Sequence, residues 1–289
     1  MLYEGTVYRP PSEAYSLIVQ ITVGCAHNKC TFCNMYKDKK FRIKSLEEVF
    51  RDLQYMKDHY GNAERIFLCD GDALVVKTED LKKILLKIQD LFPYCERVGI
   101  YGAPRDILRK SLKELKELKE LGLGIVYLGV ESGSDKILKY INKGVTAEEM
   151  VKAGRKIKDS GIKLSTTLIS GLGSKENWKE HAIKSAQIIN NIDPDYVGLL
   201  TLMVEKDTKL YEEIQNKNFK LLTPKEIMLE TRLFIENIKV TNCIFRSNHA
   251  SNYVPLGGTL PKDKNLILNT IDECVKGKYR FKDEEFRAL

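Results

Sequence analysis

Three cysteines lie close together near the start of the chain, at Cys25, Cys30 and Cys33 in "GCAHNKCTFCNMYK", with the spacing C-x4-C-x2-C. In a short irregular loop, three thiolates can each bind one iron of a cubane iron–sulfur cluster, which leaves the fourth iron without a protein ligand. An open coordination position is typical of a catalytic metal, because structural zinc sites close with four ligands. The spacing therefore favours a catalytic cluster over a structural metal.

A zinc site is the alternative interpretation of the same loop, and it needs a fourth ligand. His27 lies inside the loop and is the best candidate, because the other four cysteines are solitary: Cys69, Cys95, Cys243 and Cys274. A zinc-stabilised nucleic-acid-binding module would follow from this interpretation. The net charge of +7 gives it little support, since lysines alternate with glutamates in stretches such as "SLKELKELKELG". That pattern is typical of a solvated helix surface, so a nucleic-acid partner is not expected.

The composition is that of a globular protein, with 289 residues, 43% apolar and 30% charged. This length predicts one or two domains. No apolar run approaches the roughly 20 residues of a membrane helix, and the first residues lack the order of a signal peptide. We therefore expect a cytoplasmic protein whose cysteines are thiols or metal ligands rather than disulfides.

Six short apolar or β-branched runs alternate with longer helical patterns. The predicted strands are 16–22, 65–69, 97–102, 125–130, 163–169 and 196–202. Several helices are predicted to start at an S/T-x-x-E capping box, at Ser45, Ser111, Thr146 and Thr223. Repeated β-then-α units with nearly continuous apolar strands predict an α/β fold with a parallel sheet covered by helices.

Small and polar clusters follow the predicted strands directly. The cysteine loop follows the first strand, and "DGDA" (70–73), "APRD" (103–106), "ESGS" (131–134) and "SGLGSKE" (170–176) follow the next four. A doubly wound open sheet would satisfy the same order of elements. Because reactive groups gather where parallel strands end, the position of these clusters on one rim favours a barrel.

These segments resemble motifs of the radical S-adenosylmethionine (radical SAM) enzymes. Their cluster motif is usually C-x3-C-x2-C with an aromatic residue before the last cysteine; Phe32 supplies that residue, and this chain has one more residue between Cys25 and Cys30. "YLGVESGSDKILKYINKG" (127–144) resembles the fourth-strand segment of the elongator, methylthiotransferase and heme-chaperone branch. "GDA" (71–73) takes the place of the family's Gly-Gly-Glu turn, and "LISGLGSKE" (168–176) that of its fifth-strand glycine motif.

The resemblance implies a partial (β/α)6 TIM-like barrel with a short C-terminal extension. We expect an N-terminal extension at 1–15, the barrel at 16–222, and a C-terminal helical segment with a substrate-side loop at 223–289. It also implies an enzyme that reductively cleaves S-adenosylmethionine at a [4Fe–4S] cluster held by Cys25, Cys30 and Cys33. The resulting 5′-deoxyadenosyl radical would abstract hydrogen from a small-molecule substrate, with electrons from a donor such as flavodoxin or ferredoxin.

Further site residues are implied by the same resemblance. The backbone of the 71–73 turn would receive the ammonium and carboxylate of the cofactor, and the Glu131 carboxylate would bind its ribose hydroxyls. Arg105 follows the third strand and could bind a carboxylate, though a surface role is equally open. The full set expected to bind the cofactor is Phe32, Gly71, Asp72, Ala73, Arg105, Glu131, Ser132, Gly171 and Gly173.

A polar run, "FRSNHASNYVPLGGTLP" (245–261), lies beyond the last predicted strand. An open six-unit barrel leaves a lateral gap, and a radical intermediate must be kept from water. We expect this loop to fold back over the rim, with Arg246 and His249 facing the substrate. The alternative within the same fold is a heme-binding or heme-delivery protein that performs no hydrogen abstraction and could use His249 as an axial ligand.

Overall fold

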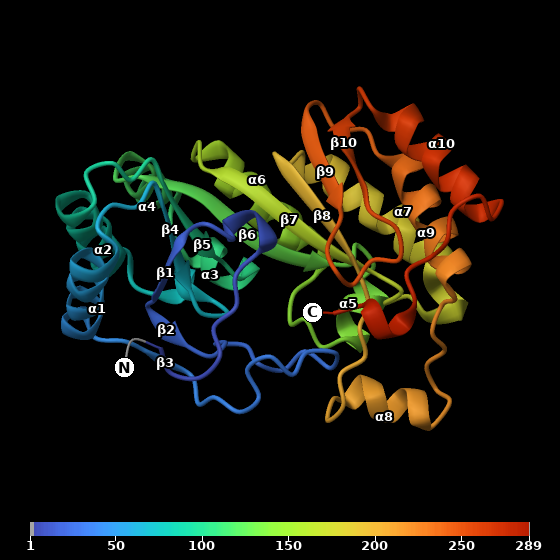
Figure 1. Ribbon diagram of the computed structural model, residues 1–289, viewed down its shortest axis with the longest axis horizontal. Coiled ribbons are helices and arrows are strands. Elements are labelled where there is room, and N and C mark those ends of the chain that lie inside the picture. The colour runs from blue at the N-terminus through green and yellow to red at the C-terminus, as the bar shows by residue number, and fades with distance from the viewer. Residues whose placement is uncertain (1–2, 289) are drawn as a thin grey trace. The chain divides into compact units, whose positions relative to one another are not determined.

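A computed structural model describes residues 3–288, and they form an α/β fold whose main sheet has eight strands (Figure 1). The sheet order is β1-β4-β5-β6-β7-β8-β9-β10. The strands are β1 (Leu17–Gln20), β4 (Arg65–Cys69), β5 (Arg97–Tyr101), β6 (Leu123–Glu131), β7 (Lys163–Ser170), β8 (Tyr196–Thr201), β9 (Cys243–Ser247) and β10 (Leu256–Leu260). The predicted α/β class and parallel pairing are confirmed: β1–β4, β4–β5, β5–β6, β7–β8 and β8–β9 are parallel, and only β9–β10 is antiparallel among these pairs.

Helices follow most of the parallel strands, as predicted. They are α1 (Leu46–Tyr60), α2 (Thr78–Leu91), α3 (Pro104–Arg109), α4 (Leu112–Glu120), α5 (Asp135–Tyr140), α6 (Ala147–Asp159), α7 (Ser174–Ile192), α8 (Lys209–Gln215), α9 (Pro224–Asn237) and α10 (Lys264–Val275). The capping boxes at Ser45, Ser111 and Thr223 are formed. At Thr146 the reciprocal bonds with Glu149 are also present, so the predicted helix starts are confirmed.

The first predicted strand is interrupted at Ile21. Its backbone N–H donates to Cys69 O at 2.7 Å, and its carbonyl accepts from Lys44 N at 3.0 Å. After this point the chain leaves the main sheet as β2 (Thr22–Val23), which pairs antiparallel with β3 (Arg42–Ile43). The cysteine loop therefore lies between the two strands of a separate ribbon, with β2 before it and β3 after it.

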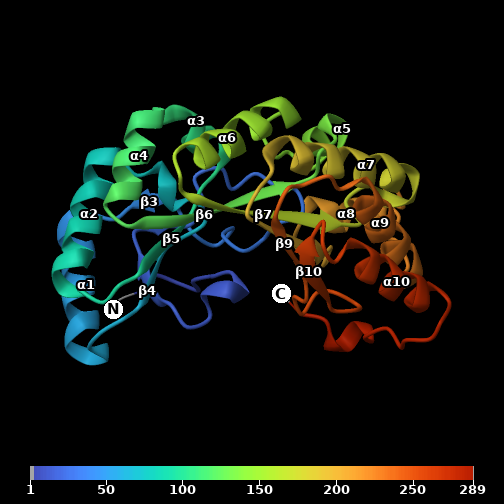
Figure 2. The same cartoon turned by 90° about the horizontal axis from the view of Figure 1, so that it is seen from above.

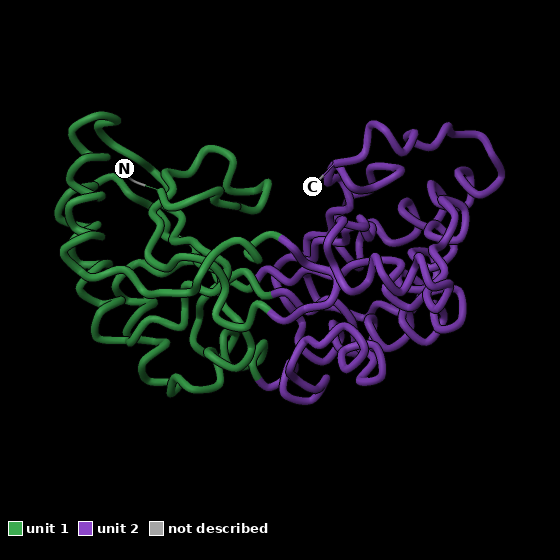
Figure 3. The backbone as a smooth tube through the Cα atoms, turned by 90° about the horizontal axis from the view of Figure 1, so that it is seen from below, with its two compact units in different colours: residues 1–28, 35–128, 153–164 green, residues 29–34, 129–152, 165–289 purple. Residues whose placement is uncertain are grey.

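The chain forms two compact units, and each has its own core (Figure 3). Unit 1 comprises residues 1–28, 35–128 and 153–164, and unit 2 comprises 29–34, 129–152 and 165–289. Fully buried side chains such as Leu53 and Phe67 form the core of unit 1. In unit 2, Phe234 of α9 packs on Phe245 of β9, and α9 contacts both α7 and α10 (Figure 2).

The C-terminal region contains more sheet than the sequence analysis expected. The run 245–261 was predicted to be a loop, but its two ends belong to β9 and β10, which pair as a hairpin with Arg246 opposite Gly257. The first of these strands extends the sheet beside β8. Only residues 248–255 between the two strands are a connection. Among the described residues, no helix has the length and apolar character needed to span a membrane.

Candidate functional site

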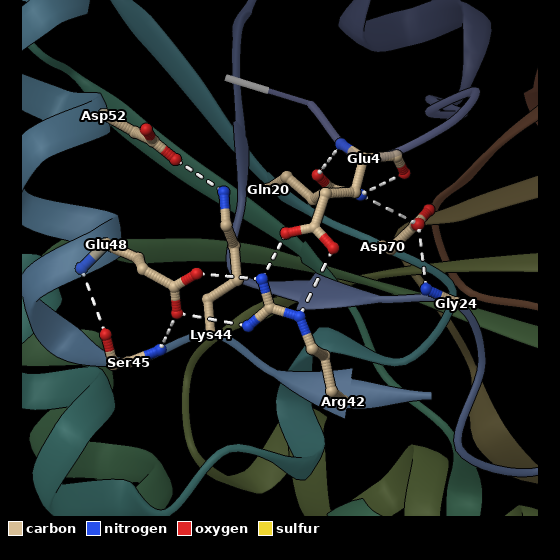
Figure 4. Close-up of polar contacts among 9 residues, drawn as sticks. All are labelled: Glu4, Gln20, Gly24, Arg42, Lys44, Ser45, Glu48, Asp52 and Asp70. Carbon is tan, nitrogen blue, oxygen red and sulfur yellow. Dashed lines mark hydrogen bonds and ion pairs between the residues drawn. The ribbon is translucent and has the colours of Figure 1, made fainter. Parts of the chain in front are cut away.

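The cysteine loop occupies residues 24–41, between β2 and β3, and its ends are held together by these two strands. The Arg42 guanidinium reinforces this base, because it binds the Glu48 carboxylate at 2.8 Å and also the carboxylate of Glu4 (Figure 4). Between the ribbon strands the chain has no helix or strand. Such a loop can follow the shape of a cofactor while its base stays fixed.

The buried carboxylate of Asp70, directly after β4, holds the start of the cysteine loop. Asp70 Oδ2 accepts hydrogen bonds from Gly24 N at 3.1 Å, Gln20 Nε2 at 3.3 Å and Lys39 Nζ at 2.9 Å; Figure 4 shows the first two. Burial, followed by the charge of Asp70, raises the pKa of the Tyr36 phenol. Asp70 thus links β1, the residue before Cys25, and the far end of the loop.

The turn after β4 lies against the first cysteine. A Cβ added at Gly71 would come within 2.9 Å of Cys25 Cβ and 2.6 Å of Tyr36 Cε2, both closer than real Cβ contacts. Only glycine lets the backbone pass there without displacing Cys25. The 71–73 turn and Cys25 are therefore brought together within unit 1, as the predicted site requires.

The Asp72 side chain is bonded within unit 1, on the side of β5 and α3. Its Oδ1 accepts from Ala103 N at 3.0 Å, and the residue is 1% exposed. Burial and the neighbouring Asp106 carboxyl raise the pKa of Asp72 to about 8. Arg105 is half-exposed, with its Nε 3.8 Å from Asp106 Oδ2. The side chains of Asp72 and Asp106 thus serve the packing of the turn, which leaves its backbone as the part able to meet a cofactor.

The second part of the cysteine loop, residues 29–34, packs in unit 2. Thr31 N donates to Ile141 O at 2.9 Å, and Leu210 N donates to Thr31 O at 3.0 Å. Phe32 packs against the apolar cluster that contains Ile141 and Leu210. Cys30 and Cys33 thus flank a segment in which both backbone groups of Thr31 are hydrogen-bonded, and the ring of Phe32 has a packing role.

Glu131 ends β6 in a left-handed conformation, with φ at 62°. Its carboxylate accepts from Lys143 Nζ at 2.9 Å and folds back over Gly129, where any side chain would strike Glu131 Oε1. The carboxylate is mostly buried, at 11% side-chain exposure. Ser132 Oγ accepts from the N–H of Ser134, whose own hydroxyl caps α5.

Local structure explains why residues 171 and 173, after β7, are glycines. Gly171 has φ at 94°, a region that favours glycine, and its N–H donates to Glu230 Oε2 at 2.7 Å. A Cβ at Gly173 would lie 2.9 Å from backbone atoms of Asn177 and Trp178 in α7. Unit 2 therefore brings the Glu131 and Gly171 turns to the ends of strands β6 and β7, as predicted.

The two residues predicted in the C-terminal region lie on or beside β9. Arg246 is exposed, and its Nη1 donates to Phe245 O at 2.8 Å. Since Phe245 faces α9, the alternation of a strand places Arg246 on the opposite face. His249 Nδ1 accepts from Ser251 N at 3.1 Å, and burial lowers the pKa of this imidazole.

Four residues that the sequence analysis did not single out support these segments: Asp70, Lys39, His181 and Glu230. His181 is 2% exposed, with Nδ1 2.9 Å from Glu230 Oε1 and Nε2 3.3 Å from Glu131 O. Asp70 belonged to the "DGDA" run, and its place directly after a buried strand was a signal. For His181, the signal was a polar residue next to Ala182 and Ser185 on the buried face of a helix.

The described residues contain no group of three or more His, Cys, Asp or Glu side chains placed to hold a metal ion. In these residues neither a zinc site nor the three cysteines of the expected cluster are gathered as such a group. A cubane cluster has a different requirement, because each thiolate binds a different iron. None of the seven cysteines, all of which lie within the described residues, is in a disulfide, and Cys25, Cys30 and Cys33 are partly exposed.

Comparisons with known proteins identify a family and a fold. The model of the radical SAM superfamily matches residues 19–185. An uncharacterized protein of Methanocaldococcus jannaschii is 28% identical over 240 residues, covering 78% of this chain and 72% of the relative. A putative methylthiotransferase of the same organism is 28% identical over 154 residues, covering 50% of this chain and 33% of the relative. The latter agrees with the branch suggested by residues 127–144.

A solved structure gives the same result at the level of the fold. The radical S-adenosylmethionine methyltransferase of Kitasatospora setae, with cobalamin and a [4Fe–4S] cluster bound, aligns with a TM-score of 0.56 at 17% identity. The alignment covers 75% of this chain and 44% of that one. At such low identity the likeness supports the partial barrel fold and says nothing about substrate.

Proposed function

The chain belongs to the radical SAM superfamily, and we propose that it uses a [4Fe–4S] cluster to cleave S-adenosylmethionine reductively and aim a 5′-deoxyadenosyl radical at its substrate. Cys25, Cys30 and Cys33 would hold the cluster as thiolates. The observation that carries this assignment is the close fit of Gly71 against Cys25, which only glycine permits. Donors of the right type are present, because these cysteines are partly exposed and form no disulfide.

The residues of the chain would bind and orient the cofactor in a defined way. The 71–73 turn would offer backbone groups to the methionine end of S-adenosylmethionine, because Gly71 and Ala73 have no polar side chain and Asp72 Oδ1 accepts from Ala103 N. Glu131 would accept hydrogen bonds from ribose hydroxyls, with Lys143 holding the carboxylate in place. The segments that carry Ser132, Gly171 and Gly173 would contribute backbone contacts.

The substrate is proposed to carry an anionic group that binds Arg246. This guanidinium is exposed beside Gly257 on the hairpin, on the face opposite α9, and its Nη1 donates to the backbone carbonyls of Phe245 and Gly258. A carboxylate or phosphate suits its fork of donors. His249 would donate from Nε2, since its Nδ1 accepts from Ser251 N. Arg246→Ala should retain cluster and uncoupled cleavage but lose substrate-dependent turnover; unchanged turnover would contradict this role.

The proposal is tested with protein prepared and reconstituted without oxygen. After reduction with dithionite, it should convert S-adenosylmethionine to methionine and 5′-deoxyadenosine, slowly in the absence of substrate. The variant with Cys25, Cys30 and Cys33 all changed to Ala should lose bound iron, sulfide and this activity, because each thiolate is an iron ligand. Cys95→Ser is the matched control and should keep all three.

Two outcomes would overturn the proposal. A full cluster in the triple variant would show that the ligands lie elsewhere. Stoichiometric heme binding without formation of 5′-deoxyadenosine would favour the heme-delivery alternative. The electron donor, for which flavodoxin or ferredoxin are candidates, can be sought by replacing dithionite with each reduced protein in the same assay.

A further inference from the structure

Two turns of unit 2 that the proposed function assigns to S-adenosylmethionine are held by one buried pair of side chains. His181 of α7 and Glu230 of α9 are 2% and 1% exposed, and they contact each other at 2.9 Å. The other ring nitrogen of His181, Nε2, lies 3.3 Å from Glu131 O at the end of β6. The free end of Glu230 reaches Gly171 N after β7, at 2.7 Å.

The chemistry of the four groups fixes where the protons lie. A backbone carbonyl can only accept, so His181 Nε2 must carry the proton that faces Glu131 O. The Gly171 N–H is a donor, so Glu230 Oε2 must accept. One further proton lies between His181 Nδ1 and Glu230 Oε1. Every buried polar group in this series is then satisfied, which is the condition under which such a network fixes a single geometry.

Both turns have left-handed backbone at the point where they are held. Glu131 has φ at 62° and Gly171 has φ at 94°. A non-glycine residue in this region is uncommon and needs surrounding structure to keep it there. The hydrogen bond to His181 falls on Glu131 itself, whose carboxylate is the proposed ribose ligand.

Helix α7 makes further contacts with the same turn. Ser185 Oγ accepts from Gly133 N at 3.1 Å, and Ser134 Oγ donates to Glu180 Oε1 at 2.6 Å. A Cβ at Gly133 would overlap the backbone of Lys184, so the turn lies directly on the helix. The 131–134 turn is thus docked along one side of α7 by successive contacts.

We propose that His181, Glu230 and Ser185 are positioning residues. They would hold the Glu131 and Gly171 turns in the positions needed to bind S-adenosylmethionine. This inference rests on the proposed function for the identity of the ligand. It also goes beyond it, because these three residues touch neither cysteine nor cofactor in that assignment. Their effect should appear as weaker cofactor binding with the cluster intact.

The test uses cluster-loaded protein and four variants. Glu230→Ala removes the carboxylate that contacts both Gly171 N and His181 Nδ1. Glu230→Gln keeps an oxygen for Gly171 N and offers an N–H to His181 Nδ1. Ser185→Ala removes only the bond to Gly133 N and leaves a small change in volume. The control is Asn190→Ala, since Asn190 also joins α7 to the end of α9, through Asn237 O at 2.9 Å, but lies away from both turns.

Two measurements are made on each variant: amide hydrogen exchange without S-adenosylmethionine, and the dissociation constant for S-adenosylmethionine. Glu230→Ala should speed exchange at 131–134 and 171–174 and raise the constant about tenfold or more, since a hydrogen bond to a charged group is lost. Ser185→Ala should raise it roughly threefold to tenfold. Glu230→Gln and Asn190→Ala should stay near wild type, and iron content should be unchanged throughout.

The outcomes separate this inference from the proposed function. Wild-type protein that carries a cluster but does not bind S-adenosylmethionine overturns the proposed function and the cofactor assignment with it. If amide hydrogen exchange of both turns is unchanged in Ser185→Ala and Glu230→Ala, the positioning role is wrong. This holds whether or not S-adenosylmethionine is the ligand. If Glu230→Ala does not fold, Ser185→Ala decides, and an unchanged dissociation constant in that variant rejects the inference. Equal loss in Glu230→Gln and Glu230→Ala also rejects it, because hydrogen-bond geometry would then not be the cause.

Discussion

The turns after β4 and after β6 follow the same kind of parallel strand but are built in opposite ways. In the first, Asp70 and Asp72 point into unit 1 and bind partners there, so the side chains anchor the turn and the backbone of Gly71 is left to face Cys25. In the second, the backbone is anchored on α7, and the side chain of Glu131 is the group proposed to bind the cofactor. Mutations should therefore affect the two turns differently: side-chain changes in the first should alter stability, and those in the second should alter ligand binding.

The largest expected effect is at Asp70. Asp70→Asn places an amide opposite Lys39 in a site where both side chains are nearly fully buried, and breaking a buried ion pair costs about 3–5 kcal/mol of unfolding free energy. The loop start at Gly24 loses its charged acceptor at the same time, so iron content after reconstitution should fall. Denaturant titration and iron analysis measure the two effects.

Asp52→Asn is the matched control for this variant. The Lys44–Asp52 pair is buried to a similar extent, with side chains 4% and 6% exposed, but neither residue belongs to the cysteine loop at 24–41. It should destabilise unit 1 comparably and leave iron content unchanged. Equal iron loss in both variants would mean that Asp70 acts through general stability and not through the loop.

The next effect is at Glu131, and it concerns binding. Glu131→Ala should weaken S-adenosylmethionine binding roughly ten- to hundredfold, because a charge-assisted hydrogen bond contributes about 1.5–3 kcal/mol. The cluster should remain, since no iron ligand is removed. Equilibrium dialysis of cluster-loaded protein measures the affinity. Asp72→Asn in the other turn should change this affinity less than about threefold. A larger loss of affinity in Asp72→Asn than in Glu131→Ala would contradict the difference between the two turns.

The last expected effect is the pH dependence of stability that comes from Asp72. Its pKa is raised to about 8, against about 3.9 in an unfolded chain, so the folded state holds the proton more tightly. The resulting stability is complete below about pH 4 and is lost as the pH rises toward about 8, so the free energy of unfolding should slope downward between these values.

The variant Asp72→Asn should remove that slope. The amide has no titrating proton beside Asp106, and its oxygen can still accept from Ala103 N. Urea denaturation at pH 5.5, 6.5 and 7.5 compares the two proteins. If the variant keeps the slope of the wild type, another group is responsible for it.

The strands and the segments at their ends were predictable because their signals are local. Each of the six predicted strands is present within a few residues, and Glu131 and Gly171 were found from motifs that directly follow a strand. The hairpin β9–β10 was missed for a local reason as well. Its second strand, "LGGTL", contains Gly257 and Gly258, and glycine weakens the strand signal.

The supports of the site were not predictable, because they come from distant parts of the chain. His181 lies 50 residues from Glu131, and Glu230 lies 59 residues from Gly171. Asp70 lies 46 residues from Gly24. A helix-facing histidine or glutamate has no periodic signature that distinguishes a network from a surface residue, so only the folded chain reveals these partners.

Because the cysteines differ in accessibility, their alkylation can measure how much of the protein carries a cluster. Cys69, Cys243 and Cys274 are buried, and burial also raises the pKa of the partly exposed Cys95, which slows its alkylation. Rapid alkylation of the unloaded protein should therefore concentrate on Cys25, Cys30 and Cys33. Mass spectrometry of briefly alkylated samples would then count, molecule by molecule, how much of a preparation carries a cluster, without relying on colour or bulk iron.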